Sequence, residues 1–168
     1  MKLDPKGKKM AFVVVDVQKK FHDIQEDYVL SHDFRIYRIN QISKLFREHG
    51  RPVIFVKYVG GDEYRLYKGD DGDDFFDGIE VEDSDIIVEK HHMNSFRDSG
   101  LDKVVKDAGC DSILIAGTVT QYCVLATYFG AFDYDIIPFM AQSATMSNSE
   151  EYNHAVETVT KTLSLLKA

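Results

Sequence analysis

The chain has few of the residues that cross-link small secreted domains. Its 168 residues include two cysteines, three prolines and no tryptophan. Two cysteines, Cys110 and Cys123, do not make the disulfide framework of such domains. The apolar run after Met10 is too short for a signal peptide because it stops at Asp16, and no run reaches the roughly 20 residues of a membrane span. We therefore expect a reduced, cytoplasmic protein without a membrane partner.

An excess of basic charge is also missing. The formal net charge is −8, with 20 basic and 28 acidic residues. From Asp62 to Asp85, eleven acidic residues stand against two basic ones, so the rest of the chain sums to about +1. Because a nucleic-acid-binding surface needs clustered Lys and Arg, we expect no nucleic-acid partner.

What the chain does contain is a series of short runs rich in Val and Ile. Continuous apolar runs of this length are typical of strands that are covered on both faces, as in a parallel sheet. The predicted strands are 11–15, 52–56, 85–89, 112–117 and 134–139.

Helical patterns separate most of these runs. Apolar residues recur every three to four positions over 36–46 and 101–108, and 121–132 is predicted as a third helix. A last helix is expected to begin at a Ser147–Glu150 capping box; its predicted apolar face is Val156, Val159, Leu163 and Leu166. This alternation predicts one α/β domain over residues 1–168, with three α/β/α layers. The sheet should be mostly parallel, with a strand order close to 3-2-1-4-5-6.

Residues 60–84 interrupt the alternation with a long, acidic, Gly-rich stretch. Loops of this length in compact domains are often lids or binding elements. A solvated surface insertion explains the stretch equally well. Its aspartates lack the spacing of an EF-hand, which argues against a calcium site.

Three chemically useful side chains follow predicted strands. Asp16 follows 11–15, Lys90 follows 85–89, and Cys123 lies shortly after 112–117. Since ligands of open parallel sheets bind beyond the carboxyl ends of the strands, a carboxylate, an ammonium and a thiol should face one crevice.

This trio fits nucleophilic catalysis. A helix N-terminus and a nearby ammonium should lower the thiol pKa from its usual value of about 8.5. A carboxylate can accept the thiol proton and return it to a leaving group, and backbone N–H groups of a tight turn can bind an oxyanion. Each residue also has a structural explanation: Asp16 as a strand end, Lys90 as an exposed lysine, and Cys123 as a small buried hydrophobe. Spacing alone leaves both explanations open.

Three segments resemble the isochorismatase-like cysteine hydrolases, a family that includes isochorismatases, nicotinamidases, N-carbamoylsarcosine amidohydrolases and ureidoacrylate amidohydrolases. They are VVVDVQKKF (13–21), VEKHHMNSF (88–96) and AGTVTQYCVLATYFGAFDYDI (116–136). Their order and spacing agree with the family, and the similarity spans roughly residues 10–145.

The resemblance implies a catalytic triad of Asp16, Lys90 and Cys123. It also implies a cis peptide bond before Thr120, with Val119 and Thr120 in the oxyanion-binding turn. Asp16 would take the Cys123 proton, the thiolate would attack an amide-like carbon, and water would release the thioester. Isochorismatases proper lack the cysteine nucleophile, so Cys123 argues against their activity here.

The resemblance also suggests a substrate pocket. Its expected residues are Gln18, Phe21, Tyr58, Phe96 and Tyr122. Ordinary core packing of Phe21 and Phe96, and a position of Tyr122 on the helix surface, stay open as alternatives.

The chain departs from the nicotinamidases where they bind a metal. Their histidines after the second strand are absent from FVKYVGGDEY (55–64). His91 and His92 are adjacent, and adjacent side chains diverge on an extended chain. We therefore expect no metal and no cofactor.

The sequence thus predicts a cysteine-dependent hydrolase of a small amide, ureide or carbamoyl C–N bond. Its partners should be a small-molecule substrate and further copies of itself, in a dimer or a larger assembly. One alternative is a catalytically silent binding scaffold of the same family. A dinucleotide-binding domain is the other, but DVQKKF (16–21) lacks the G-x-G-x-x-G that it needs after the first strand.

Overall fold

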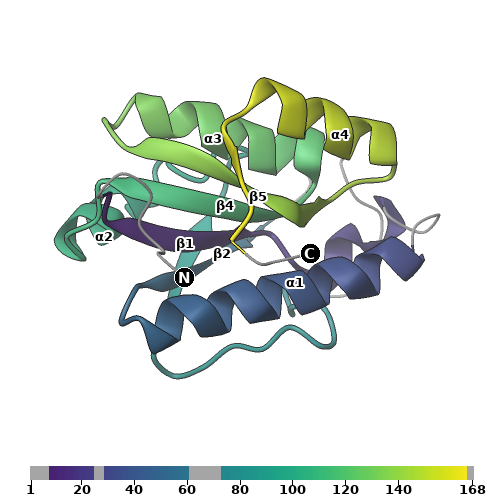
Figure 1. The fold of residues 1–168 in the computed structure, drawn as a ribbon, viewed down its shortest axis with the longest axis horizontal. Coiled ribbons are helices and arrows are strands. Elements are labelled where there is room, and N and C mark those ends of the chain that lie inside the picture. Colours follow the sequence, from purple (N-terminus) through teal and green to yellow (C-terminus); the bar gives the residue numbers. More distant parts are fainter. Residues whose placement is uncertain (1–7, 25–28, 61–72, 166–168) are drawn as a thin grey trace.

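The computed structural model describes residues 8–24, 29–60 and 73–165 (Figure 1). Within these ranges six strands form one sheet in the order β3-β2-β1-β4-β5-β6, and every neighbouring pair is parallel. The strands are β1 (Met10–Val15), β2 (Val53–Tyr58), β3 (Ile86–Lys90), β4 (Ser112–Thr118), β5 (Ile137–Met146) and β6 (Thr162–Leu163). The helical elements are η2 (Lys19–Ile24), α1 (Val29–Glu48), α2 (Leu101–Asp107), η4 (Thr120–Val124), α3 (Leu125–Phe132) and α4 (Glu150–Val159).

The sheet lies between two helical layers. Helix α1 covers one face, and α3 and α4 cover the other (Figure 1). All six residues of β1 are buried, and alternate residues point to opposite faces. Val13 and Val15 pack in the cluster that includes α2 and α3, whereas Phe12 and Val14 pack against α1. The predicted three-layer α/β fold and its strand order are confirmed.

Element ends differ from the prediction where backbone turns intervene. The third predicted helix is divided into a π-helical turn, η4, and the helix α3. Strand β5 begins only at Ile137, because Asp135 adopts a φ of 58° just before it. None of the described helices combines the length and apolar character needed to cross a membrane.

The prediction for the last helix is wrong at both ends. Ser149, not Ser147, is the N-cap, and its side chain accepts a hydrogen bond from the Glu151 N–H. The helix stops at Val159, which is 67% exposed. Leu163 lies in β6, where it pairs with Ala141. The helical periodicity does not continue past Val159, because Thr162–Leu163 pairs with β5 as a strand.

Residues 61–72 of the acidic stretch lie outside the described residues. The part that follows is attached to the rest of the domain by backbone hydrogen bonds. The Phe76 N–H donates to the Val17 carbonyl at 2.8 Å, and the Lys19 N–H donates to the Asp74 carbonyl at 2.9 Å. Whether 60–84 acts as a lid stays a prediction.

Candidate active site

Asp16 and Lys90 form a buried ion pair at the carboxyl edge of the sheet. Asp16 directly follows β1, and its backbone N–H donates to the Val56 carbonyl at 3.0 Å. Lys90 ends β3, and its Nζ lies 2.9 Å from Asp16 Oδ2. The exposed fractions of the two side chains are 0% for Lys90 and 1% for Asp16. The structure therefore brings together two residues that are 74 positions apart.

The ammonium of Lys90 lies close to three oxygen atoms. Besides Asp16, these are the Met93 carbonyl at 2.9 Å and Ser95 Oγ at 3.3 Å. Ser95 Oγ lies 2.7 Å from Thr127 Oγ1, which lies 2.7 Å from the carbonyl oxygen of Cys123. A chain of buried hydroxyl groups thus joins Lys90 to the helix that carries Cys123. These contacts place the ammonium of Lys90 beside Asp16, where it supplies a positive charge.

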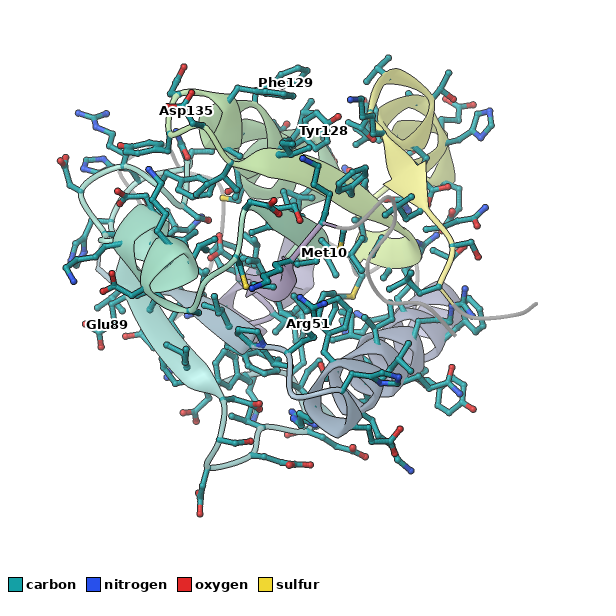
Figure 2. All side chains as sticks on the ribbon, turned by 60° about the vertical axis from the view of Figure 1, so that its left-hand side comes forward. Met10, Arg51, Glu89, Tyr128, Phe129 and Asp135 are labelled. Carbon is teal, nitrogen blue, oxygen red and sulfur yellow. The ribbon has the colours of Figure 1, made fainter. Side chains whose placement is uncertain are left out.

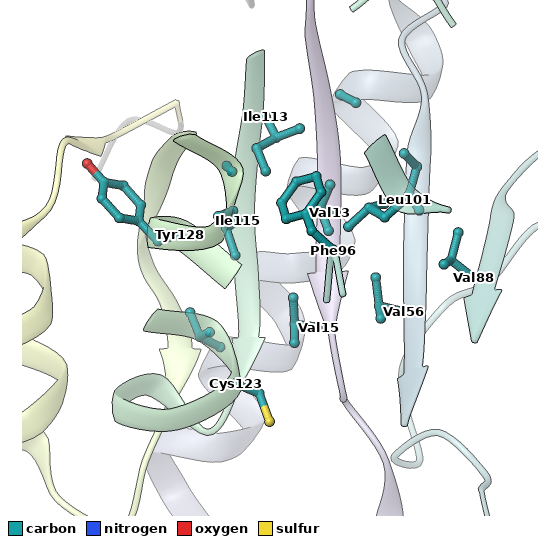
Figure 3. Packing of buried hydrophobic residues seen from close by; sticks show 14 of the residues in the cluster. Val13, Val15, Val56, Val88, Phe96, Leu101, Ile113, Ile115, Cys123 and Tyr128 are labelled. Carbon is teal, nitrogen blue, oxygen red and sulfur yellow. The ribbon is translucent and has the colours of Figure 1, made fainter. Parts of the chain in front are cut away.

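Gly117 allows the turn that carries Cys123 to approach β1. Its φ is 121°, and a Cβ at this position would lie 2.0 Å from the Val15 carbonyl oxygen. Any side chain here would force β4 away from β1, so glycine is required for this close approach. The chain then passes Val119 and enters η4. Figure 3 shows the sulfur of Cys123 beyond the carboxyl ends of the strands, pointing away from the apolar cluster.

The Cys123 thiol is 2% exposed, and this burial controls its acidity. Burial, followed by the charge of Asp16, raises the pKa of the Cys123 thiol above its ordinary value, while Lys90 acts in the opposite direction. The expectation of a lowered thiol pKa is therefore wrong. The cost of placing an anion in a buried site beside a carboxylate exceeds the stabilisation that one ammonium provides.

Burial also raises the pKa of Asp16, and Lys90 opposes this effect most strongly, followed by Cys123 and Lys20. A raised pKa makes Asp16 a stronger base than a surface carboxylate. When Asp16 takes the proton of Cys123, the net charge of thiol, carboxyl and ammonium stays at zero. Proton transfer inside the site thus avoids the desolvation cost of creating a new net charge.

The cis peptide bond joins Thr118 to Val119, not Val119 to Thr120 as expected. Strand β4 extends to Thr118, and η4 begins at Thr120, so Val119 is the single residue between them. Its carbonyl accepts hydrogen bonds from the N–H groups of Tyr122 and Val124 at 3.0 and 3.3 Å. The sequence motif located the turn but not the peptide bond within it. The oxyanion role of Val119 and Thr120 stays a prediction.

Gln18 and Tyr58, two of the predicted pocket residues, are joined by two hydrogen bonds. The Tyr58 N–H donates to Gln18 Oε1 at 2.8 Å, and Gln18 Nε2 donates to the Tyr58 carbonyl at 3.0 Å. The Gln18 amide thus ties the turn after β1 to the end of β2. The Tyr58 ring centroid lies 5.5 Å from Lys90 Nζ, which places this ring beside the buried pair.

The other predicted pocket residues have different surroundings. Phe21 is buried, and its ring meets the Tyr58 ring edge-on at 6.2 Å. Phe96 is 1% exposed and stacks on Tyr134 at 5.3 Å within the core. Tyr122 is 39% exposed on η4. The described contacts therefore favour core packing for Phe96 and a surface position for Tyr122.

Sequence reasoning missed two buried polar residues near the site. Lys20 is 4% exposed, and its Nζ lies 2.8 Å from Asp73 Oδ1 and 5.4 Å from the Tyr58 ring centroid. Asn153 of α4 is 3% exposed and contacts Thr120. Neither had a sequence signal, because Lys and Asn are mostly exposed.

The adjacent histidines contact different groups. His91 Nδ1 lies 2.7 Å from the Val59 carbonyl oxygen, whereas His92 Nε2 lies 3.5 Å from Asp98 Oδ2. In the described ranges, no three His, Cys, Asp or Glu side chains gather as a possible metal site.

Comparison with known proteins is consistent with this geometry. Residues 10–164 match the family model described as the isochorismatase domain. The chain belongs to the isochorismatase family. It is similar to YrdC of Bacillus subtilis (strain 168), described as an uncharacterized isochorismatase family protein, with 27% identity over 123 residues. The match covers 71% of this chain and 64% of YrdC, so it spans less than two thirds of that relative.

Solved structures show the same fold. N-carbamoylsarcosine amidase from Thermoplasma acidophilum has a TM-score of 0.77 at 22% identity, with 93% of this chain and 95% of that chain covered. The pyrazinamidase of Pyrococcus horikoshii in complex with zinc has a TM-score of 0.77 at 19% identity, with 94% and 99% covered. At these identities, the similarity between this chain and the two amidase structures concerns the fold alone.

Proposed function

We propose that this isochorismatase-family protein is a hydrolase that cleaves a C–N bond in a small amide, ureide or carbamoyl compound, with Cys123 as nucleophile. The observation that carries the proposal is the buried Asp16–Lys90 pair, whose charged atoms lie 2.9 Å apart. Both residues interact with the Cys123 thiol, because Asp16 raises its pKa and Lys90 lowers it. The amidase names of two structural neighbours support the same reaction class.

In the first half of the reaction, Asp16 takes the Cys123 proton and the sulfur attacks the carbonyl carbon of the substrate. An S–C bond forms, and the carbonyl π electrons move to oxygen. Backbone N–H groups of the turn at Val119, Thr120 and Cys123 would stabilise this oxyanion. As the C–N bond breaks, Asp16 gives its proton to the leaving nitrogen. An acyl thioester on Cys123 and a free amine or ammonia result.

Water completes the cycle. Asp16 takes a proton from the water, whose oxygen attacks the thioester carbon. The C–S bond then breaks, and the proton on Asp16 returns to the Cys123 sulfur. In this scheme Lys90 exchanges no proton. Its ammonium pairs with Asp16 and donates to the Met93 carbonyl and to Ser95 Oγ.

The expected homo-oligomer remains a proposal. Phe129 points outward from α3 (Figure 2), and it is 54% exposed. Phe132 on the same helix is 50% exposed. Exposed aromatic side chains that lie together on one helix are typical of protein interfaces.

A panel of small amides, ureides and carbamoyl compounds tests the proposal with wild type, Cys123→Ala and Asp16→Asn. We expect kcat/KM for any hydrolysed compound to fall at least about 10³-fold in both variants. Intact-mass spectrometry of wild type should show an acyl adduct on Cys123 that Cys123→Ala lacks. Circular dichroism checks that the variants fold.

The catalytically silent scaffold is the competing outcome. It would be supported if wild type hydrolysed nothing on the panel and formed no adduct. Normal turnover by either variant would instead show that the substituted residue does not have the assigned role.

A further inference from the structure

A buried hydrogen bond joins α4 to the turn that carries Cys123. The Thr120 hydroxyl donates to Asn153 Oδ1 at 2.5 Å, although the two residues are 33 positions apart. Thr120 is 0% exposed and Asn153 is 3% exposed. Thr120 is the first residue of η4, and Cys123 lies in the same turn. The bond therefore fixes the side chain that begins the nucleophile turn.

Asparagine is a costly residue at this place in α4. Asn153 is three residues before Val156, so both lie on the buried face of the helix. A buried amide loses the hydrogen bonds that it makes with water, and this loss is unfavourable unless protein groups replace them. A leucine would pack on this face without that cost. The asparagine differs from a leucine here because it can accept the hydrogen bond from Thr120.

A second contact joins η4 to the residues just before α4, and it is more open to water. Gln121 Oε1 accepts from the Ser147 hydroxyl at 2.8 Å, and Gln121 Nε2 donates to Asn148 Oδ1 at 3.2 Å. The bond to Asn148 is exposed, whereas the one between Thr120 and Asn153 is buried. Since water competes poorly for a buried bond, the Asn153 contact should hold the turn more firmly.

We propose that Asn153 is a positioning residue for the oxyanion-binding turn. By holding the Thr120 side chain, it orients the backbone N–H groups of Val119, Thr120 and Cys123 toward the place where the substrate oxygen becomes negative. This inference rests on the proposed function. It predicts weaker stabilisation of a tetrahedral oxyanion when the bond is removed, because such stabilisation requires donors at hydrogen-bond distance from that oxygen. The reactivity of the sulfur itself should change little.

Acetaldehyde is a probe that builds a tetrahedral centre without a known substrate. The Cys123 sulfur adds reversibly to the carbonyl carbon, so that an S–C bond forms and the carbonyl π electrons move to oxygen. The thiol proton passes through Asp16 to that oxygen, which balances the reaction. Titration of isotope-labelled acetaldehyde, followed by NMR, gives the affinity. Iodoacetamide is the comparison, because its alkylation of the sulfur releases iodide and forms no tetrahedral carbon that bears an oxygen.

The variants Thr120→Val and Asn153→Leu each remove the bond. In both we expect acetaldehyde affinity to fall about tenfold or more, while the iodoacetamide rate at Cys123 stays within about threefold of wild type, since Asp16 and Lys90 are untouched. Thr120→Ser keeps the hydroxyl and should restore the affinity. His154→Ala, at the exposed neighbour of Asn153, is the matched control and should bind acetaldehyde like wild type.

A double variant separates positioning from stability. Thr120→Val with Asn153→Leu leaves no buried polar group unpaired, so thermal stability should recover relative to the single variants. Acetaldehyde affinity should stay low. Recovery of affinity together with stability would show that the bond only packs α4, and it would overturn the inference. Wild-type affinity in both single variants would do the same. If wild type itself formed no adduct, the proposed function would fail, and the inference with it.

Discussion

Two acid–base pairs, one part-buried and one fully buried, lie at opposite ends of the strands β2 and β3. They differ in the number of hydrogen bonds that each carboxylate accepts. At the amino end, Asp85 precedes β3, and both of its oxygens accept hydrogen bonds from Arg47, at 2.9 and 2.6 Å. Glu82 adds its backbone N–H to the Asp85 carboxylate at 2.8 Å. At the carboxyl end, Asp16 has the 2.9 Å contact with Lys90. No backbone N–H of the described residues donates to the carboxylate oxygens of Asp16.

The difference decides what each carboxylate can do. The hydrogen bonds that Arg47 donates to Asp85 are the main cause that raises the pKa of Arg47, so this pair is stabilised in its charged form. Burial is the main cause at Asp16, and it raises the pKa of that carboxyl. A well-bonded pair holds the structure together, whereas an under-bonded carboxylate beside a thiol can exchange a proton with it.

The largest effect should come from neutralising one carboxylate of each pair. Asp16→Asn should lower kcat/KM at least about 10³-fold, because the base is lost. Asp85→Asn should leave kcat/KM within about threefold, since that side chain lies at the far edge of the sheet. Both are measured on a substrate from the amide panel. Equal losses would show that the two pairs do not differ in function.

Removing the cations should affect stability in different ways. Arg47→Met leaves the Asp85 charge buried, and we expect a loss of about 3 kcal/mol in the free energy of unfolding. In Lys90→Met, the strongest influence that lowers the pKa of Asp16 is gone, so Asp16 should take up a proton. Between the unfolded pKa of 3.8 and the raised folded value, the native state then binds more protons, and stability falls as pH rises.

Urea unfolding of both variants from acidic to neutral pH measures this difference. A Lys90→Met variant whose stability rose with pH over this range would contradict the raised pKa of Asp16.

The smallest effect should appear in cysteine labelling. Because the pKa of Cys123 is raised, its alkylation by iodoacetamide should still accelerate above pH 9.0, rather than level off near neutral pH. Asp16→Asn removes one cause of the raised thiol pKa, so labelling at a fixed alkaline pH should increase a fewfold. Peptide mass spectrometry follows Cys123, with the buried Cys110 as reference. Rapid labelling of Cys123 alone at neutral pH would contradict the raised pKa of its thiol.

Local signals predicted the arrangement of the site better than its energetics. Apolar runs such as 11–15 and 112–117 identify central strands, because only strands covered on both faces need continuous apolar residues. Placing Asp16, Lys90 and Cys123 after such strands is enough to bring them to one edge. The Ser147–Glu150 pattern failed, because Ser147 donates to Gln121 and Ser149 caps the helix instead.

The order of apolar runs, helical repeats and strand-end side chains by itself determined the parallel sheet and the edge at which the three reactive residues lie. Only the tertiary structure decided that burial raises the pKa of the Cys123 thiol, that Lys90 pairs with Asp16, and that Asn153 accepts a hydrogen bond from Thr120. These properties depend on burial and on contacts between distant segments. The desolvation free energy of a side chain depends on all the groups packed around it, and a local sequence pattern does not contain that information.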